Sequence, residues 1–179
     1  GGSLDVEALR RGNSVYFPDR AIPMLPERLS GDLCSLRPDR DRFASVAELV
    51  FDAAAKLKRR SFYPAVIRSR VRLVYEDAAR WMDDPGAEAT ESDDHGVGSE
   101  VVEQLRTLWR LAERLGRRRR KAGAIDFELP EPRIEVDDAG VVTDVAQARR
   151  THAHRAVEEA MLAANRAVAE ALVAAECTS

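Results

Sequence analysis

The sequence has two cysteines, no long apolar run and no segment resembling a secretion signal. Cys34 and Cys177 lie far apart, which excludes a disulfide framework and makes a reducing cytoplasm the expected location. A membrane-spanning helix needs roughly 18–20 consecutive apolar residues. No stretch of the chain approaches that length, so we expect no membrane partner. Residues 1–5 also lack the basic and apolar segments of a signal peptide.

The chain also lacks a large net charge of either sign. Its 28 Lys and Arg residues stand against 31 Asp and Glu residues, for a formal charge of −3. This balance does not indicate an acidic partner, so any argument for nucleic-acid binding must rest on local charge. With 45% hydrophobic residues, the 179-residue chain has enough apolar material for one folded domain.

Familiar catalytic motifs are missing as well. The sequence has no Gly-rich phosphate loop, no Ser-His-Asp set and no Cys-His pair that looks catalytic. His152 and His154 are two positions apart on a predicted helix, so their side chains point about 200° apart, which is unsuitable for one shared metal. The residues by themselves therefore predict no zinc site.

Apolar periodicity and turn residues predict a mixed α+β fold. In the first half we expect a short helix over 4–12, an extended and turning stretch rich in proline over 14–26, and a short helix after Pro26. Two strands follow, over 43–52 and 59–73, because these segments are rich in β-branched and aromatic residues. Ala55 stands in their turn where a glycine is expected. A helix is predicted after Tyr75, followed by an acidic loop over 83–98.

The second half is dominated by two long predicted helices, over about 99–121 and 151–175. Acidic residues open the first of them and the basic run 117–121 closes it, which suits the helix dipole and solubility. Short strands are expected over 124–128 and 132–136, with a hairpin turn leading into 141–143. The expected architecture is a small, mostly antiparallel sheet with packed helices.

Three arginines alternate along the second predicted strand. On a strand, Arg68, Arg70 and Arg72 share one face with their guanidinium groups roughly 7 Å apart. A phosphate chain is a natural partner for such a stripe. The alternative is a solvated sheet face whose arginines pair with nearby acids, and the charge pattern slightly favours it.

A few residues stand where they can contact a ligand. Aromatic residues are scarce at 6%, and Tyr16, Tyr75 and Phe127 fall in loops or junctions, where a ring either stacks on a base or anchors the core. Glu158 and Glu159 are adjacent in a helix and therefore face different directions. One of them can point into a site while the other meets solvent or a basic partner; a fully solvated helix face is the rival interpretation.

Five short strings occur in order along the chain. They are Arg11-Gly12-Asn13-Ser14-Val15-Tyr16-Phe17-Pro18, Ile22-Pro23-Met24-Leu25-Pro26, Leu33-Cys34-Ser35-Leu36, Arg72-Leu73-Val74-Tyr75 and Val157-Glu158-Glu159-Ala160-Met161. Their order and spacing resemble the catalytic domain, called RNB, of the ribonuclease II and ribonuclease R family. The resemblance covers essentially the whole chain, and the second and third strings together are highly specific.

The resemblance implies a processive 3′→5′ exoribonuclease that hydrolyses single-stranded RNA to nucleoside monophosphates with Mg²⁺. Tyr16 matches the family's tyrosine that stacks on one side of the bases, and Phe127 matches the partner ring that closes the stack. Tyr75 matches an active-centre tyrosine near the scissile phosphate, and Glu158 matches a glutamate that holds the terminal nucleotide. The match assigns no role to the arginine stripe, and DNA is not an expected partner. It implies a packed core position for Cys34.

The resemblance also implies what the chain does not contain. The family's metal-binding aspartates lie just before the matched part, and an arginine that supports the transition state lies after it. We therefore expect residues 1–179 to be an interior segment of one RNB domain, inactive alone, with the Mg²⁺ ligands outside this chain. The alternatives are a non-catalytic RNA-binding or regulatory module, and a protein-interaction domain without RNA affinity.

Overall fold

The computed structural model describes residues 1–84, 97–125, 132–137, 141–147 and 149–176. The structure begins with helix α1 (Ser3–Arg11) and a small hairpin of strands β1 (Val15–Tyr16) and β2 (Ala21–Ile22). A short π-helix, η1 (Arg28–Leu33), leads into the long strands β3 (Asp41–Phe51) and β4 (Leu57–Arg68). The remaining elements are α2 (Tyr75–Asp83), α3 (Ser99–Lys121), β5 (Pro132–Val136), β6 (Val142–Gln147) and α4 (His152–Ala174).

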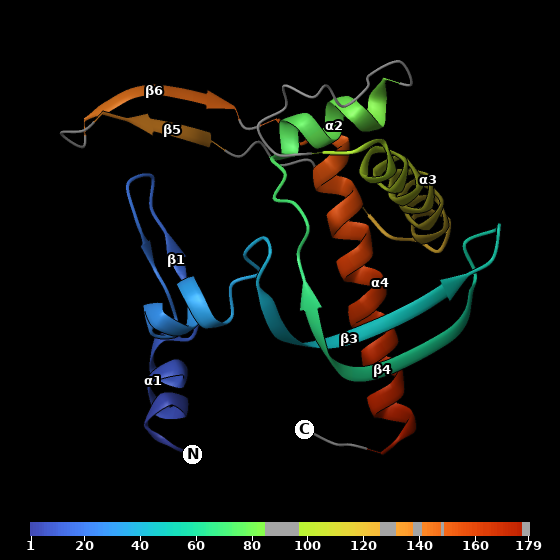
Figure 1. Ribbon diagram of the computed structural model, residues 1–179, viewed down its shortest axis with the longest axis horizontal. Helices are drawn as coiled ribbons and strands as arrows, with labels where there is room; N and C mark the ends of the chain where they lie inside the picture. Colours follow the sequence, from blue (N-terminus) through green and yellow to red (C-terminus); the bar gives the residue numbers. More distant parts are fainter. Residues whose placement is uncertain (85–96, 126–131, 138–140, 148, 177–179) are drawn as a thin grey trace.

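The α+β class is confirmed, with the strands arranged as three separate antiparallel hairpins. Strand β1 pairs with β2, β3 with β4, and β5 with β6. The long β3–β4 hairpin curves across helix α4 (Figure 1). Arg60 of β4 fastens the two together, because its Nη1 atom donates to the Ala167 carbonyl at 3.2 Å and pairs with Glu170 at 3.1 Å.

Helices α2, α3 and α4 pack around a core built mainly from alanine. The buried residues of this core are Ala78, Ala79, Met82, Ala112, Ala153 and Ala156. Small side chains let helix backbones approach closely. Larger side chains hold packed helix axes at the wider end of their usual spacing of about 8–10 Å. The buried alanines at the start of the last helix, Ala153 and Ala156, therefore lie where it packs on the two other helices.

A second cluster anchors the chain that follows β4. Trp81 is 1% exposed and packs with Val97 and Val102, and the half-buried Val71 and Leu73 complete the cluster. Strand β4 ends at Arg68, whereas the predicted strand continued to residue 73. Alternation persists over 69–73 because side chains alternate between this apolar cluster and solvent, and among the described residues only an isolated bridge between Ser69 and Pro38 continues the pairing.

The β3–β4 turn has one residue in the left-handed backbone conformation, at the position where the sequence lacks the expected glycine. Ala55 has a φ of 54° and is 2% exposed. The carboxylate of Asp52 accepts hydrogen bonds from the backbone N–H groups of Ala54 and Lys56, at 3.0 and 2.8 Å. Arg114 of α3 also donates to the Ala53 carbonyl at 2.9 Å. These contacts hold the turn in a conformation that costs alanine roughly 1–2 kcal/mol.

Some predictions are wrong, and others concern residues that the structure does not describe. Cys34 was expected in the core but is exposed, because it ends the π-helix at the surface. Most of the acidic stretch, 85–96, lies outside the described residues, and so does Phe127. The predicted strand 124–128 is described only at residues 124–125, which are not part of a strand. Within the described ranges, no helix is long and apolar enough to cross a membrane.

Candidate functional site

The N-terminal turn of helix α4 brings together residues that are far apart in the sequence. His154 is the third residue of α4, and Tyr75 is the first residue of α2. Their rings are stacked, with centroids 3.8 Å apart and planes inclined by 15°. Tyr75 is 44% exposed, so the stack leaves much of the ring accessible. Its hydroxyl group forms no hydrogen bond with any residue in the described part of the chain.

The two adjacent glutamates of α4 occupy different environments, as their neighbouring positions on a helix require. Glu159 is buried, and its Oε1 atom accepts hydrogen bonds from Nε and Nη2 of Arg119 at 3.2 and 2.8 Å. Glu158 is half-exposed and pairs with Arg150, which lies just before the helix. Glu159 therefore joins α4 to α3, whereas Glu158 is the carboxylate that a ligand can reach.

Glycine at position 116 allows the two helices to approach at this ion pair. A Cβ atom added to Gly116 would lie 3.0 Å from Oε1 of Glu159 and 3.3 Å from Nη1 of Arg120. Contacts this short are tighter than ordinary van der Waals contacts, so a side chain at position 116 would displace the glutamate or the arginine.

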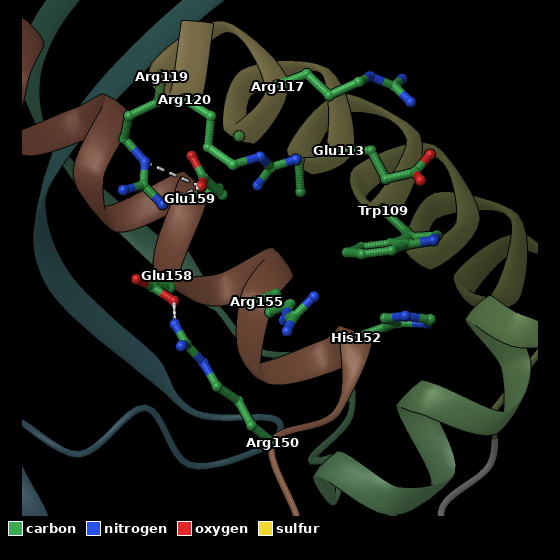
Figure 2. Close-up of a pocket in the computed structure, with 12 residues that line it drawn as sticks. Trp109, Glu113, Arg117, Arg119, Arg120, Arg150, His152, Arg155, Glu158 and Glu159 are labelled. Carbon is green, nitrogen blue, oxygen red and sulfur yellow. Dashed lines mark hydrogen bonds and ion pairs between the residues drawn. The ribbon is translucent and has the colours of Figure 1, made fainter. Parts of the chain in front are cut away.

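A cavity of about 220 Å³ lies between the end of α3 and the start of α4 (Figure 2). Five arginines and three glutamates contribute to its wall, together with a stacked pair formed by Trp109 and His152. The ring centroids of this pair are 4.2 Å apart, and His152 also pairs with Asp83 of α2. The charged residues that line the cavity are Glu113, Arg117, Arg119, Arg120, Arg150, Arg155, Glu158 and Glu159. The excess of arginine makes this cavity suitable for an anionic group.

Tyr16 lies apart from this site, in the hairpin formed by β1 and β2. Its side chain is 80% exposed, which leaves the ring available for stacking. Phe17 forms the turn with Arg20: its backbone N–H donates to the Arg20 carbonyl at 2.7 Å, and the Arg20 guanidinium lies 5.4 Å from the ring centroid. Phe17 remains 46% exposed beside this guanidinium, so Tyr16 is the more accessible aromatic ring of the two.

The three alternating arginines are all exposed, but their environments differ. Arg68 pairs across the β3–β4 hairpin with Asp41 at 2.6 Å, and this guanidinium holds the pKa of the Asp41 carboxyl below its ordinary value. Arg70 and Arg72 form no ion pair with any residue that the structure describes. The sheet-face interpretation therefore fits Arg68, and the two later arginines are available for an anionic partner.

The structure thus links two of the four predicted site residues through one helix. Glu158 belongs to α4, and Tyr75 contacts α4 through His154, four positions earlier. Side chains four positions apart share a helix face and are separated by about 6 Å along the axis. Tyr16 belongs to a separate hairpin, and Phe127 lies outside the described residues.

Local sequence patterns do not indicate that His154, Arg119 and Arg150 are parts of this site. A threonine three positions before His154 resembles the start of a capping box, and this was an available signal. The partners of Arg119 and Arg150 depend on how α3 and α4 meet, which local patterns do not encode. The two histidines do point to different neighbours, as predicted, and no group of three or more potential metal ligands occurs within the described ranges.

Comparison with known families settles the classification. The model of the family described as "RNB domain" matches residues 1–178. The chain belongs to the RNB domain family. This RNB chain is 44% identical over 166 residues to ribonuclease R of Aquifex aeolicus, a match that covers 92% of the chain and 23% of that protein. The chain therefore spans about a quarter of the length of this relative.

Solved structures agree with the sequence comparison. The RNB chain superposes on Mycoplasma genitalium RNase R in complex with ribose-methylated single-stranded RNA, with a TM-score of 0.88 and 30% identity. That match covers 98% of this chain and 26% of the other. The complex of the same enzyme with double-stranded RNA gives a TM-score of 0.89 at 30% identity, covering 98% of this chain and 30% of the other.

Proposed function

We propose that this RNB chain works within a longer 3′→5′ exoribonuclease that hydrolyses single-stranded RNA to nucleoside monophosphates in the cytoplasm. The observation that carries the proposal is that Tyr75, at the start of α2, and Glu158, in the second turn of α4, are both accessible, and that Tyr75 contacts α4 through His154. Tyr75 is held in place by the stacked ring of His154, and Glu158 is the exposed member of two adjacent glutamates. A phenol without a hydrogen-bond partner among the described residues and an accessible carboxylate, carried by the neighbouring helices α2 and α4, are suited to the end of an RNA strand.

Each of the two residues has a distinct task in this proposal. The hydroxyl of Tyr75 donates a hydrogen bond to an oxygen of the scissile phosphate. The carboxylate of Glu158 accepts hydrogen bonds from ribose hydroxyl groups of the terminal nucleotide. Because the 2′-hydroxyl distinguishes RNA from DNA at such a contact, Glu158 favours RNA. Arg150, which pairs with Glu158, supplies a positive charge beside the phosphate.

The exposed ring of Tyr16 supports a second contact, further along the strand. In the proposal Tyr16 stacks on the bases from one side and Phe127 closes the stack from the other. Two rings that sandwich bases admit unpaired bases and exclude a duplex, since paired bases cannot enter between them. This clamp would select the single-stranded 3′ end.

Hydrolysis by this family is expected to need Mg²⁺. Among the residues that the structure describes, no group of three or more potential metal ligands occurs. The proposal assigns the metal ligands to aspartates outside these 179 residues. The residues described here bind and orient RNA.

The test uses the full-length gene product that contains this chain. A 5′-labelled single-stranded RNA of about 20 nucleotides is incubated with Mg²⁺, and a second sample has its 3′ end blocked. We expect shortening from the 3′ end with release of nucleoside monophosphates, abolished by a blocked end or by chelation of the metal. Binding without shortening would replace the proposal with a non-catalytic RNA-binding module. Neither binding nor shortening would leave a protein-interaction domain.

A further inference from the structure

We propose that His154 is a positioning residue that fixes the ring of Tyr75 for its contact with RNA. The inference rests on the proposed function, because Tyr75 must act on the RNA for its position to matter. Of the rings that the structure describes, His154 is the one stacked on Tyr75, with centroids 3.8 Å apart. Stacked aromatic rings contribute roughly 0.5–1.5 kcal/mol beyond the burial of their surface.

The position of Tyr75 in its helix shows why it needs such support. Tyr75 is the first residue of α2 and follows Val74, which has an extended backbone with φ −97° and ψ 153°. The first turn of a helix lacks the full set of backbone hydrogen bonds. A side chain at this place has little local support. With 44% of its surface exposed and a hydroxyl group without a partner among the described residues, the ring depends on His154 for its orientation.

His154 is itself held by the residue that precedes its helix. The Nδ1 atom of His154 lies 2.8 Å from Oγ1 of Thr151 and accepts a hydrogen bond from the Thr151 backbone N–H at 3.3 Å. A backbone amide can only donate, so Nδ1 is the acceptor and the neutral ring carries its proton on Nε2. His154 occupies the helix position where a capping box has Glu or Gln. The cap therefore orients the imidazole, and the imidazole orients the phenol.

The other candidate site residue lies on the same helix as His154. Glu158 is four positions after His154 and shares its helix face. Thr151, His154 and Glu158 thus belong to the first two turns of one rigid helix. This helix sets the spacing between Glu158 and His154, the ring on which Tyr75 stacks, and the helix begins at the threonine cap.

A double-mutant cycle in the full-length enzyme tests the inference. The readouts are the single-turnover rate of 3′-terminal cleavage at saturating enzyme and the dissociation constant for RNA, measured with the metal chelated. We expect His154→Ala to lower the rate about threefold to tenfold, the equivalent of one stacked pair. The dissociation constant should change less than about twofold, because the histidine makes no contact with RNA itself. His154→Phe, which restores a flat ring, should recover most of the rate.

The second arm of the cycle separates this inference from the proposed function. In a Tyr75→Ala background, His154→Ala should have no further effect on the rate. If Tyr75→Ala leaves cleavage unchanged, the role assigned to Tyr75 fails, and the proposed function fails in that part. If Tyr75→Ala slows cleavage but His154→Ala does not, or slows it equally in both backgrounds, positioning by His154 is wrong.

Loss of folding is controlled with a second stacked histidine. His152→Ala removes a comparable ring from Trp109 in the same helix turn, together with the pair to Asp83, so its melting temperature sets an upper limit on the stability cost of losing such a stack. If His154→Ala lowers the melting temperature far more than His152→Ala does, and His154→Phe recovers the melting temperature but not the rate, a purely structural role is indicated. That result would overturn the proposal.

Discussion

The Oε1 atom of Glu159 lies 2.8 Å from Nη2 of Arg119, and this ion pair joins α4 to α3 beneath the half-exposed Glu158. The side chain of Glu159 is 10% exposed and that of Arg119 is 30% exposed. The two neighbouring glutamates therefore have separate roles: Glu159 connects two helices, and Glu158 faces the candidate site. Their substitution should separate stability from activity.

Glu159→Ala is expected to destabilise the protein by about 2–3 kcal/mol, because it leaves the partly buried Arg119 without its carboxylate. Glu158→Ala should change stability by less than about 1 kcal/mol, since its pair with Arg150 is half-exposed. It should nevertheless slow RNA cleavage at least about tenfold. Urea unfolding and single-turnover cleavage of both variants check the prediction. Equal losses of stability would contradict it.

Tyr16→Ala should weaken binding of single-stranded RNA about tenfold, because stacking on one base contributes roughly 1–3 kcal/mol. Tyr16→Trp should preserve binding, since it keeps a flat ring. Fluorescence anisotropy with a labelled oligonucleotide and chelated metal provides the measurement. Tyr63→Ala is a matched control, because Tyr63 is also exposed but bonds to Glu48 on the β3–β4 hairpin. If both variants bind RNA alike, stacking on Tyr16 is excluded.

Replacing Arg70 and Arg72 together by alanine should weaken RNA binding and make it less sensitive to salt. Each phosphate contact with a single strand contributes about 0.7 to the slope of log affinity against log salt concentration, so the slope should fall by about 1.4. Arg166→Ala is the control, because Arg166 is exposed on α4 and pairs with Glu170. An unchanged slope would assign both arginines to a solvated face.

Stability should depend on pH through Asp52 in the β3–β4 turn. The backbone N–H of Lys56 donates to its carboxylate, as does that of Ala54, and these bonds lower the Asp52 pKa from its ordinary 3.8. A depressed pKa in the folded state means that the stabilisation is present above the unfolded pKa and is lost as pH falls through the folded one. The stability difference between wild type and Asp52→Asn should therefore shrink as pH drops below about 4. Thermal unfolding between neutral and acidic pH measures it; a constant difference would argue against this role.

Much of the fold could be predicted from local patterns, and particular residues show where those patterns stop. Helix α3 has the predicted bounds because its apolar stripe, early acids and late arginines all agree. The end of β4 could not be predicted, because Val71 and Leu73 alternate like strand residues while packing on Trp81. Periodicity reports which side is buried and does not report whether a neighbouring strand is present.

The residues of the candidate site could be predicted from the sequence, but their arrangement in space could not. The resemblance supplied Tyr75 and Glu158, and neighbouring positions explained why Glu158 and Glu159 diverge. The stack of Tyr75 on His154 joins residues 79 positions apart in the sequence, which no local rule connects. Such a contact depends on how closely α2 and α4 approach.

The distance between α2 and α4 is set by the methyl groups of buried alanines. Ala78, Ala112 and Ala156 are almost fully buried where the three helices meet, and Ala156 has no exposed surface. Each added carbon there must push a helix outward, and the displacement would reach Tyr75 and Glu158 together because both are carried by these helices. The alanines act as spacers between the helices: their small size sets the distance between α2, which carries Tyr75, and α4, which carries Glu158. Graded replacement of Ala156 by serine and valine would increase that distance in small steps while leaving both candidate site residues unchanged.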